Sequence, residues 1–351
     1  MALLTTTIGA YPKPDYVPIS DWFCGPDGPD TAEPTKLYAA EMTRAGADAE
    51  ALFRRATEEV IGDQIAVGID IPTDGEVRRE NYIHYHCRHL DGIDFDVITE
   101  RRMRGVYAAH VPTITGPVGA STPFLAAEWK LAQELSDKPV KATLPGPMTI
   151  ANSISDAYYE DAATRGRDLA AALNAEVRSL AEAGCRHVQI DEPVFARQPD
   201  RALDFGLADL ERCFAGVGGE VTRTVHICCG YPSGLDIPDY PKAPKTSYLD
   251  LAEALDQSEI DAVSLEDAHR HNDLATLLAR FRDTIVALGC VDVTRSAIEP
   301  AAEIAGRLRE ALGHIEAERL WVAPDCGLGL LGRELAMAKL RNMCMAAATV
   351  A

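Results

Sequence analysis

The strongest constraint on the fold is a repeated alternation of short apolar, β-rich runs with longer amphipathic helical patterns. Eight runs have the character of buried strands, namely Leu4–Gly9, Ala66–Thr73, Lys141–Leu144, His187–Asp191, Thr222–Cys228, Ala262–Glu266, Thr284–Val291 and Leu320–Pro324. Helical periodicity occurs between or after them at Ala47–Ile61, Asp168–Ala183, Asp273–Phe281, Glu303–Leu312 and Glu334–Ala346. A strand followed by a helix, repeated eight times in 351 residues, predicts an α/β fold of the (β/α)₈ TIM-barrel type.

Two segments depart from this alternation. Within Phe95–Ser121, the stretch Arg104–Thr115 alternates like a hairpin strand, so we expect a β-hairpin insertion after strand two, at about 95–121, beside the barrel mouth. Tyr231–Ser247 contains four prolines and predicts a long loop of the kind that often binds ligands. Since the chain shows no linker, repeat or low-complexity tract, we expect a single catalytic domain over residues 1–351.

Charge and composition exclude several classes of partner. The chain has 54 Asp and Glu against 34 Lys and Arg, a net charge of −20, which repels nucleic acid and anionic membrane surfaces. It lacks both an apolar run of the roughly 20 residues that a membrane span requires and a basic, apolar leader at Met1–Ala10. Nine cysteines without framework spacing indicate a reducing compartment. We therefore expect a soluble cytoplasmic protein.

Potential metal ligands follow three of the predicted strands. The active site of a parallel barrel is built at the carboxyl ends of its strands. His226 and Cys228 share one face of strand five, Glu266 ends strand six, and Cys326 follows strand eight. This donor set suits Zn²⁺, which converts a coordinated thiol into a nucleophilic thiolate. The alternative is that the cysteines only fill the core.

The other strand ends carry groups suited to an amino-acid substrate. Strand one ends in Ile8-Gly9-Ala10, whereas Glu76 and Asp191 follow strands two and four. A buried carboxylate needs a partner, which a substrate ammonium could provide. Arg78, Arg79 or backbone N–H groups are the alternative partners.

Three further patterns have simpler explanations. Gly327-x-Gly329-x-x-Gly332 matches a dinucleotide fingerprint, but the 19 residues after Gly332 are too few for a βαβ unit. His84, His86 and His89 would point in different directions on a helix, so we expect part of a polar pocket wall and not a second metal site. His269 and His271 follow Glu266 closely and are either donors to the site or solvated loop residues.

In these residues the chain resembles the catalytic domain of cobalamin-independent methionine synthase. The matching motifs occur in the family's order over almost the whole chain. They are Thr5-Thr6-Thr7-Ile8-Gly9, Asp74-Gly75-Glu76, Gly146-Pro147-Met148-Thr149-Ile150, Gln189-Ile190-Asp191-Glu192-Pro193, His226-Ile227-Cys228, Glu266 and Pro324-Asp325-Cys326-Gly327-Leu328.

The resemblance implies a specific site. Zn²⁺ would be held by His226, Cys228, Glu266 and Cys326. Homocysteine would be bound through its amino and carboxylate groups by Glu76, Asp191 and the backbone of Ile8, Gly9 and Ala10. Glu76 and Asp191 would thereby orient the substrate for catalysis.

The sequence also departs from the family pattern. The full-length family has two barrels, and this chain resembles only the second. Ser153 stands where the family has a Trp that stacks on the pterin, Thr294 stands where it has a His thought to act as an acid, and Ala10 stands where it has Ser. These departures leave the thiol-activating half of the site intact and alter the methyl-donor half.

We therefore expect a zinc-dependent methyltransferase that methylates homocysteine to methionine, with methylfolate or methylcobalamin as donor and a corrinoid protein as a possible partner. The alternatives are an alkyltransferase for another thiol, such as an epoxyalkane:coenzyme M transferase, and a metal-free decarboxylase on a related barrel. A protein that stores metal or carries methyl groups without turnover is the non-enzymatic alternative.

Overall fold

A parallel β-sheet forms the centre of the protein. The computed structural model describes residues 2–24, 32–103, 107–232, 234–238 and 240–350. All neighbouring strands of the six-stranded sheet are parallel and follow one another in the order β3-β5-β6-β7-β8-β9. Their bounds are β3 (Ala142–Pro145), β5 (His187–Asp191), β6 (Thr222–Ile227), β7 (Ala262–Leu265), β8 (Ile285–Gly289) and β9 (Leu320–Ala323). Each lies within two residues of its predicted position.

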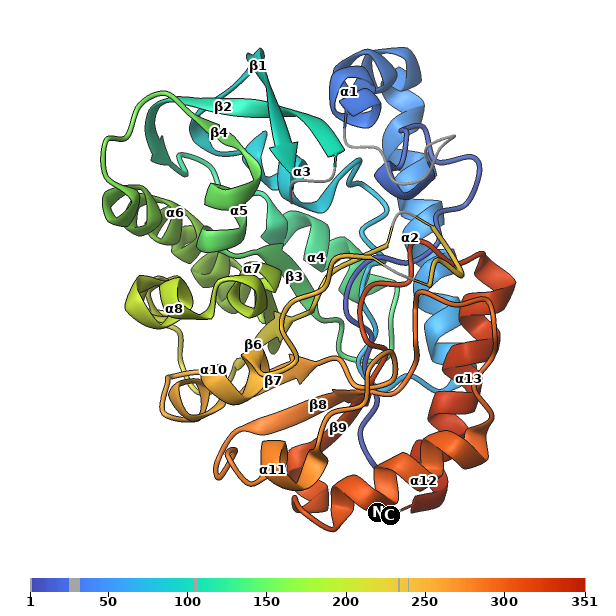
Figure 1. Ribbon diagram of the computed structural model, residues 1–351. Helices are drawn as coiled ribbons and strands as arrows, with labels where there is room; N and C mark the ends of the chain where they lie inside the picture. Colours follow the sequence, from blue (N-terminus) through green and yellow to red (C-terminus); the bar gives the residue numbers. More distant parts are fainter. Residues whose placement is uncertain (1, 25–31, 104–106, 233, 239, 351) are drawn as a thin grey trace.

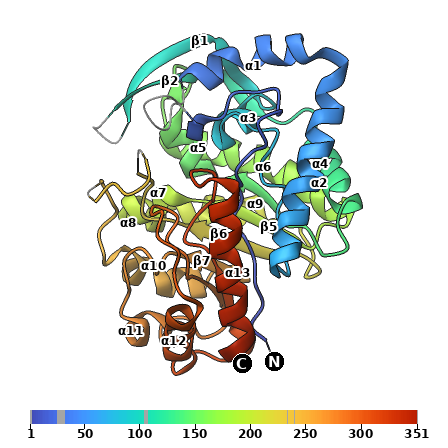
Figure 2. The same cartoon turned by 90° about the vertical axis from the view of Figure 1, so that its right-hand side faces the viewer.

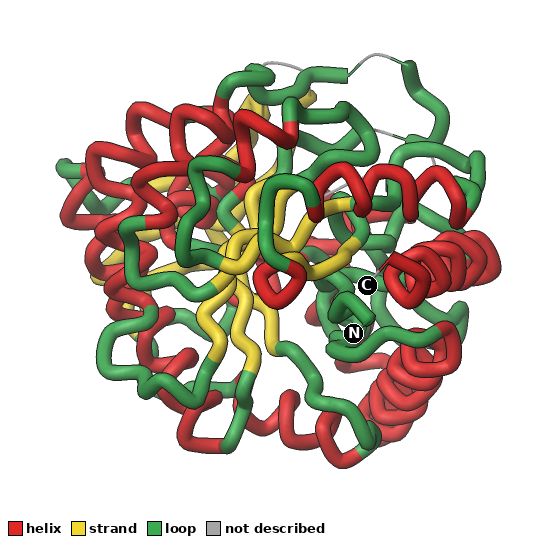
Figure 3. Tube along the Cα trace, turned by 90° about the horizontal axis from the view of Figure 1, so that it is seen from below, coloured by secondary structure: helices red, strands yellow, loops and turns green. Residues whose placement is uncertain are grey.

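The first part of the chain joins the two edges of this sheet. Thr5 forms a parallel bridge with Val322 of β9, and Thr6 forms one with Ile71. Thr73 then bridges to Lys141, immediately before β3. The predicted first and second strands therefore occupy the two remaining barrel positions, and the expected TIM-barrel type is confirmed (Figure 3).

These first two positions differ from the prediction in detail. Leu4–Gly9 forms isolated bridges in place of a regular strand. Ala66–Thr73 begins too early, because helix α2 (Ala49–Val67) continues through Val67 and ends at Gly68, whose φ of 107° suits glycine.

Helices and loops surround the sheet (Figures 1 and 2). The remaining helices are α1 (Ala32–Ala45), α3 (Tyr82–Cys87), α4 (Leu125–Glu134), α5 (Pro147–Ser153), α6 (Ala162–Ala183), α7 (Pro193–Arg197), α8 (Pro199–Arg201), α9 (Leu207–Cys213), α10 (Ser247–Asp256), α11 (Leu274–Leu278), α12 (Ala301–Leu312) and α13 (Arg333–Val350). Short helical segments are η1 (Trp22–Cys24), η2 (Gly46–Asp48), η3 (Ala202–Gly206) and η4 (Ala317–Arg319). The two ends of the chain lie together, with the Leu3 N–H donating to the Ala347 carbonyl at 3.4 Å.

The predicted insertion is a β-hairpin at the opposite end of the molecule from the termini (Figure 1). β1 (Asp91–Met103) pairs antiparallel with β2 (Tyr107–Gly119), and β2 adds β4 (Ser155–Asp156) in parallel. The hairpin begins four residues earlier than predicted. Ala109 and Val111 of β2 are buried and line the pocket described below, so the hairpin covers part of the barrel mouth.

No helix in the described part of the chain is long and apolar enough to cross a membrane.

Candidate metal centre and substrate pocket

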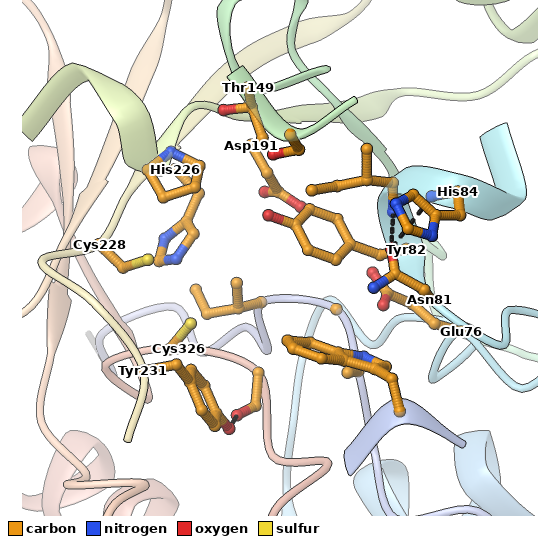
Figure 4. A pocket seen from close by; sticks show the side chains of 18 of the residues that line it. Glu76, Asn81, Tyr82, His84, Thr149, Asp191, His226, Cys228, Tyr231 and Cys326 are labelled. Atoms are coloured by element: carbon orange, nitrogen blue, oxygen red, sulfur yellow. Dashed lines mark hydrogen bonds between the residues drawn. The ribbon is translucent and has the colours of Figure 1, made fainter. Parts of the chain in front are cut away.

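A pocket opens at the carboxyl ends of the barrel strands. Its lining includes three of the four predicted metal ligands and both predicted carboxylates. In Figure 4, His226, Cys228 and Cys326 lie on one side of the pocket, Glu76 lies on the other, and Asp191 lies between them. The structure thus brings together side chains from four separate parts of the sequence.

Three ligand atoms lie close enough together to share one metal ion. One ligand atom each from His226, Cys228 and Cys326 lies within 4.8 Å of the others. Tetrahedral Zn²⁺ with bonds of about 2.3 Å to sulfur and 2.0 Å to nitrogen places its ligand atoms roughly 3.5–3.8 Å apart. Among the described residues, the buried His226 Nε2 atom has no hydrogen-bond partner, and Nδ1 lies 3.0 Å from Ser264 Oγ. If Nδ1–H donates to Ser264, Nε2 presents its lone pair to the metal position.

The two sulfur atoms also influence each other electrostatically. A hydrogen bond from Cys326, together with His226, lowers the pKa of the Cys228 thiol well below its usual value. The resulting negative charge and burial raise the pKa of Cys326. One thiolate therefore forms readily, and a divalent cation would favour loss of the second proton.

The carboxylate of Asp325 positions the loop that carries Cys326. It accepts hydrogen bonds from the backbone N–H groups of Asp267 (2.9 Å), Ala268 (3.0 Å) and His269 (2.6 Å), which follow β7. A Cβ atom at Gly289 would lie 2.2 Å from Asp325 Oδ1, so this approach requires glycine. The Asp-Cys motif thus joins the loops after β7 and β9.

Glu266, the fourth ligand that the resemblance implied, lies outside the three-residue group. Its side chain is buried, and burial together with Cys228 raises its pKa well above the usual value, while hydrogen bonds with Cys229 act in the opposite direction. Cys229 points away from the metal position, as the strand alternation predicted, and lies 3.3 Å from the Tyr248 hydroxyl. Ligation by Glu266 stays a prediction.

Glu76 already has a cationic partner inside the protein. Arg79 Nη1 and Thr143 Oγ1 each lie 3.1 Å from Glu76 Oε1. Its backbone adopts a φ of 57°, and a Cβ atom at Gly9 would lie 2.5 Å from the carboxylate. Burial raises the pKa of Glu76 and Arg79 opposes this effect. The alternative that Arg79 neutralises Glu76 is therefore observed, whereas Arg78 pairs with Glu50.

Asp191 is the better-placed carboxylate for a substrate cation. Its Oδ1 atom accepts a hydrogen bond of 2.7 Å from Gln189 Nε2, which also donates to the Ile8 carbonyl. Within the described residues, Asp191 forms no ion pair with Lys or Arg. Burial raises its pKa to about 7, while His226 acts to lower it. An ammonium group in the pocket would stabilise the ionised carboxylate.

Ile8, Gly9 and Ala10 line the pocket, and substrate binding by their backbone stays a prediction. All three carbonyl groups accept hydrogen bonds from within the protein: from Gln189 Nε2 to Ile8, from Thr73 Oγ1 to Gly9 and from the Leu328 N–H to Ala10. The N–H groups of this segment can donate to a substrate carboxylate, and each carbonyl oxygen keeps a second lone pair.

Other sequence predictions have mixed outcomes. His84 lines the pocket, with Nδ1 2.7 Å from Thr35 Oγ1, whereas His86 and His89 do not line it. Among the described residues, no second group of three metal-ligating side chains forms. The His269 imidazole contacts Thr294 and Tyr240 and is not part of the pocket lining.

The sequence reasoning missed the aromatic residues of the pocket, namely Trp22, Phe23, Tyr82 and Tyr231. Tyr231 was predicted only as part of a binding loop. Trp22 and Phe23 stand in no recognisable motif, so only the tertiary structure could identify them.

Comparison with known proteins agrees with this geometry. Residues 3–349 match the family model described as the cobalamin-independent synthase catalytic domain. The chain is 30% identical over 343 residues to a methionine synthase from Sulfolobus acidocaldarius, covering 97% of this chain and 90% of the relative. A methionine synthase from Sulfurisphaera tokodaii is 29% identical.

Among solved structures, a B12-independent methionine synthase from a Shewanella species, in complex with selenomethionine, is 30% identical with a TM-score of 0.84. The match covers 99% of this chain and 97% of that one. With the pocket geometry and a family match over nearly the full length, the chain belongs to the cobalamin-independent methionine synthase catalytic-domain family.

Proposed function

We propose that this protein is a transferase that moves a methyl group to the thiol of homocysteine and releases methionine. The observation that carries the proposal is that His226, Cys228 and Cys326 share one pocket with Asp191. A thiol-activating group and an ammonium-binding group are the two features that an amino-acid thiol requires. The relatives named methionine synthase, and the one solved with selenomethionine, support the same reaction.

The metal is part of this proposal. The donor set of one imidazole and two thiols fits Zn²⁺, and the unpartnered His226 Nε2 supports a metal at this position. His226, Cys228 and Cys326 would hold the ion, with Glu266 proposed as fourth ligand. Bound Zn²⁺ would supply Lewis acidity that favours the thiolate form of a substrate thiol.

The protein's own residues orient the substrate. Asp191 binds the ammonium group, Glu76 contributes a second negative charge that Arg79 balances, and the Ile8–Ala10 backbone faces the carboxylate. Held in this way, the substrate sulfur points towards the two cysteines. The substrate thiol first loses its proton to solvent. As the sulfur–carbon bond forms, the bond between the methyl carbon and the donor breaks, and the donor keeps the electron pair of that bond. Positioning of this kind lowers the activation barrier of the reaction, by about 7 kcal/mol or more in favourable cases.

A donor screen tests the reaction. Purified protein, with its zinc content measured, is incubated with homocysteine or coenzyme M and with methyltetrahydrofolate mono- or triglutamate, methylcobalamin or an epoxide. We expect methionine from homocysteine and poor turnover with the triglutamate, because Ser153 and Thr294 alter the methyl-donor half of the site. Product only from coenzyme M would support the alternative thiol alkyltransferase, and no thiol alkylation with any donor would contradict the proposal.

Substitution of the sulfur ligands tests the metal centre. Cys228→Ser or Cys326→Ser should each abolish zinc retention and methyl transfer together, because both thiols contribute to one site. Cys213→Ser is the matched control, since this buried thiol at the end of α9 donates to the Asp209 carbonyl, does not line the pocket and should leave the zinc content unchanged. Zinc is measured by atomic emission on the purified variants. Full zinc occupancy in both ligand variants would show that the assignment is wrong.

A further inference from the structure

Four neighbouring aromatic residues, their rings tilted by 37–52° to one another, form an aromatic wall in the pocket. This aromatic wall consists of Trp22 and Phe23 of η1, Tyr82 at the start of α3 and Tyr231 in the loop after β6. The Trp22 ring centroid lies 4.2 Å from that of Phe23, 6.2 Å from that of Tyr82 and 6.4 Å from that of Tyr231. All four residues line the same pocket as the predicted metal ligands.

The wall lies directly beside the sulfur ligands. The Tyr231 hydroxyl donates a hydrogen bond of 2.5 Å to the carbonyl of Gly327, the residue after Cys326. Burial raises the pKa of Tyr82 and of Tyr231, and negative charge on Cys228 and Cys326 raises both further. Figure 4 shows Tyr231 next to Cys326 and Tyr82 nearer the centre of the pocket.

Close packing holds Phe23, the neighbour of Trp22, against the loop that carries Cys326. A Cβ atom at Gly329 would lie 2.4 Å from Phe23 Cδ2, so the ring rests against the backbone of that glycine. This contact explains a glycine of the Gly327-x-Gly329-x-x-Gly332 pattern without any dinucleotide. A molecule stacked on the aromatic wall would therefore have its near end beside the metal ligands.

Homocysteine does not account for the aromatic wall. Its polar groups are matched by Asp191, Glu76 and the Ile8–Ala10 backbone, and its aliphatic chain has no ring to stack. The rest of the lining includes the apolar side chains of Ala109 and Val111 from β2 and the small polar Ser153 of α5. The lining thus combines aromatic rings with small and apolar side chains, as in sites that bind flat conjugated ligands.

We propose that Trp22 binds the planar conjugated ring of the methyl donor and determines how this donor is held. This inference rests on the proposed methyl transfer and identifies which residue provides the stacking surface that Ser153 cannot provide. A pterin and a corrin share the chemistry of a large conjugated ring, so the test includes both.

The test compares Trp22→Leu with Trp22→Phe. Stacking on an aromatic side chain contributes about 1–3 kcal/mol. Trp22→Leu should therefore raise the KM for the accepted donor at least about fivefold and leave the KM for homocysteine and the zinc content unchanged. Trp22→Phe keeps an aromatic ring, so its KM for the donor should stay within about threefold of that of the parent protein. Tyr158→Leu, which removes an exposed aromatic side chain that does not line the pocket, is the matched control.

Binding without turnover provides an independent measurement. Isothermal titration calorimetry of the zinc-loaded protein with methyltetrahydrofolate monoglutamate in one arm and methylcobalamin in the other gives the donor Kd. One donor should bind, and Trp22→Leu should weaken it at least about fivefold. The inference would be overturned if Trp22→Leu, with normal zinc content, bound the donor with the same Kd as the parent protein. It would also be overturned if the parent protein bound neither donor. Donor binding without methionine formation would contradict the proposed reaction and leave the Trp22 result intact.

Discussion

At the scale of single residues, the two pocket carboxylates have different roles because their partners differ. Glu76 is paired with Arg79 at 3.1 Å, so its charge is already balanced. Asp191 accepts a hydrogen bond from the neutral amide of Gln189, and burial raises its pKa to about 7. Asp191 therefore gains most from an incoming ammonium group.

Replacement of Asp191 should weaken homocysteine binding. A hydrogen bond to a charged group contributes about 1.5–3 kcal/mol, so Asp191→Asn should raise the KM for homocysteine roughly 10- to 100-fold. Zinc content should not change. Asp204→Asn, a substitution of an exposed aspartate, is the control. Steady-state kinetics with saturating donor measure the effect, and an unchanged KM would remove Asp191 from the substrate site.

The same carboxylate predicts a pH dependence. Because the raised pKa of Asp191 is about 7, the fraction of ionised carboxylate falls as the pH drops through 7, and ammonium binding falls with it. The kcat/KM for homocysteine should therefore decrease below about pH 7. Profiles between pH 6 and 8.5 should show this limb in the parent protein and lack it in Asp191→Asn. If kcat/KM still decreased at low pH in the variant, the titrating group would be one other than Asp191.

Much of this site could be predicted from the sequence because its residues stand at the ends of regular strands. The two-residue spacing of His226 and Cys228 fixes a common face, so their shared direction follows from strand alternation. Arg79 as the partner of Glu76 was one of several alternatives, because spacing does not reveal which nearby cation folds back. Trp22 was missed because its position depends on packing against residues distant in sequence.

At the scale of elements, Glu192 connects helix α5 to strand β5. Its buried carboxylate accepts hydrogen bonds from the Met148 N–H (2.9 Å), the Thr149 N–H (3.0 Å) and Thr149 Oγ1 (2.7 Å). A Cβ atom at Gly146 would lie 2.2 Å from the Glu192 side chain, which explains the glycine before the helix. The contact satisfies the first N–H groups of α5, whose last residues line the pocket.

Removal of this carboxylate should destabilise the fold. Glu192→Ala leaves buried N–H groups without an acceptor, and we expect a loss of about 1–3 kcal/mol in the free energy of unfolding. Glu58→Ala, at an exposed position of α2, should change it by less than about 0.5 kcal/mol. Urea denaturation followed by circular dichroism measures both. Equal stability of the two variants would show that Glu192 does not hold α5.

At the scale of the whole molecule, the proposed metal ligands lie about 100 residues apart in the sequence, and the folded barrel brings them together. A ligand that binds the folded state but not the unfolded state stabilises the whole structure. Removal of zinc by a chelator should therefore lower the apparent melting temperature, and added zinc should restore it. Differential scanning calorimetry measures this shift, with Cys228→Ser as the variant that should not respond.

The same experiment tests the single-domain prediction. One domain with a continuous core should unfold in one cooperative transition. Two transitions, only one of which responds to zinc, would show that residues 1–351 form two independent units.

The sequence by itself determined the alternation of strands and helices, the hairpin insertion and most of the strand-end residues of the site. Those features follow from local periodicity, which depends on neighbours only a few residues away. The tertiary structure decided which groups meet. It closed the barrel through isolated bridges of Thr5, Thr6 and Thr73, paired Glu76 with Arg79 and brought Trp22 to the pocket. These outcomes depend on packing between segments far apart in the chain, which no local pattern encodes.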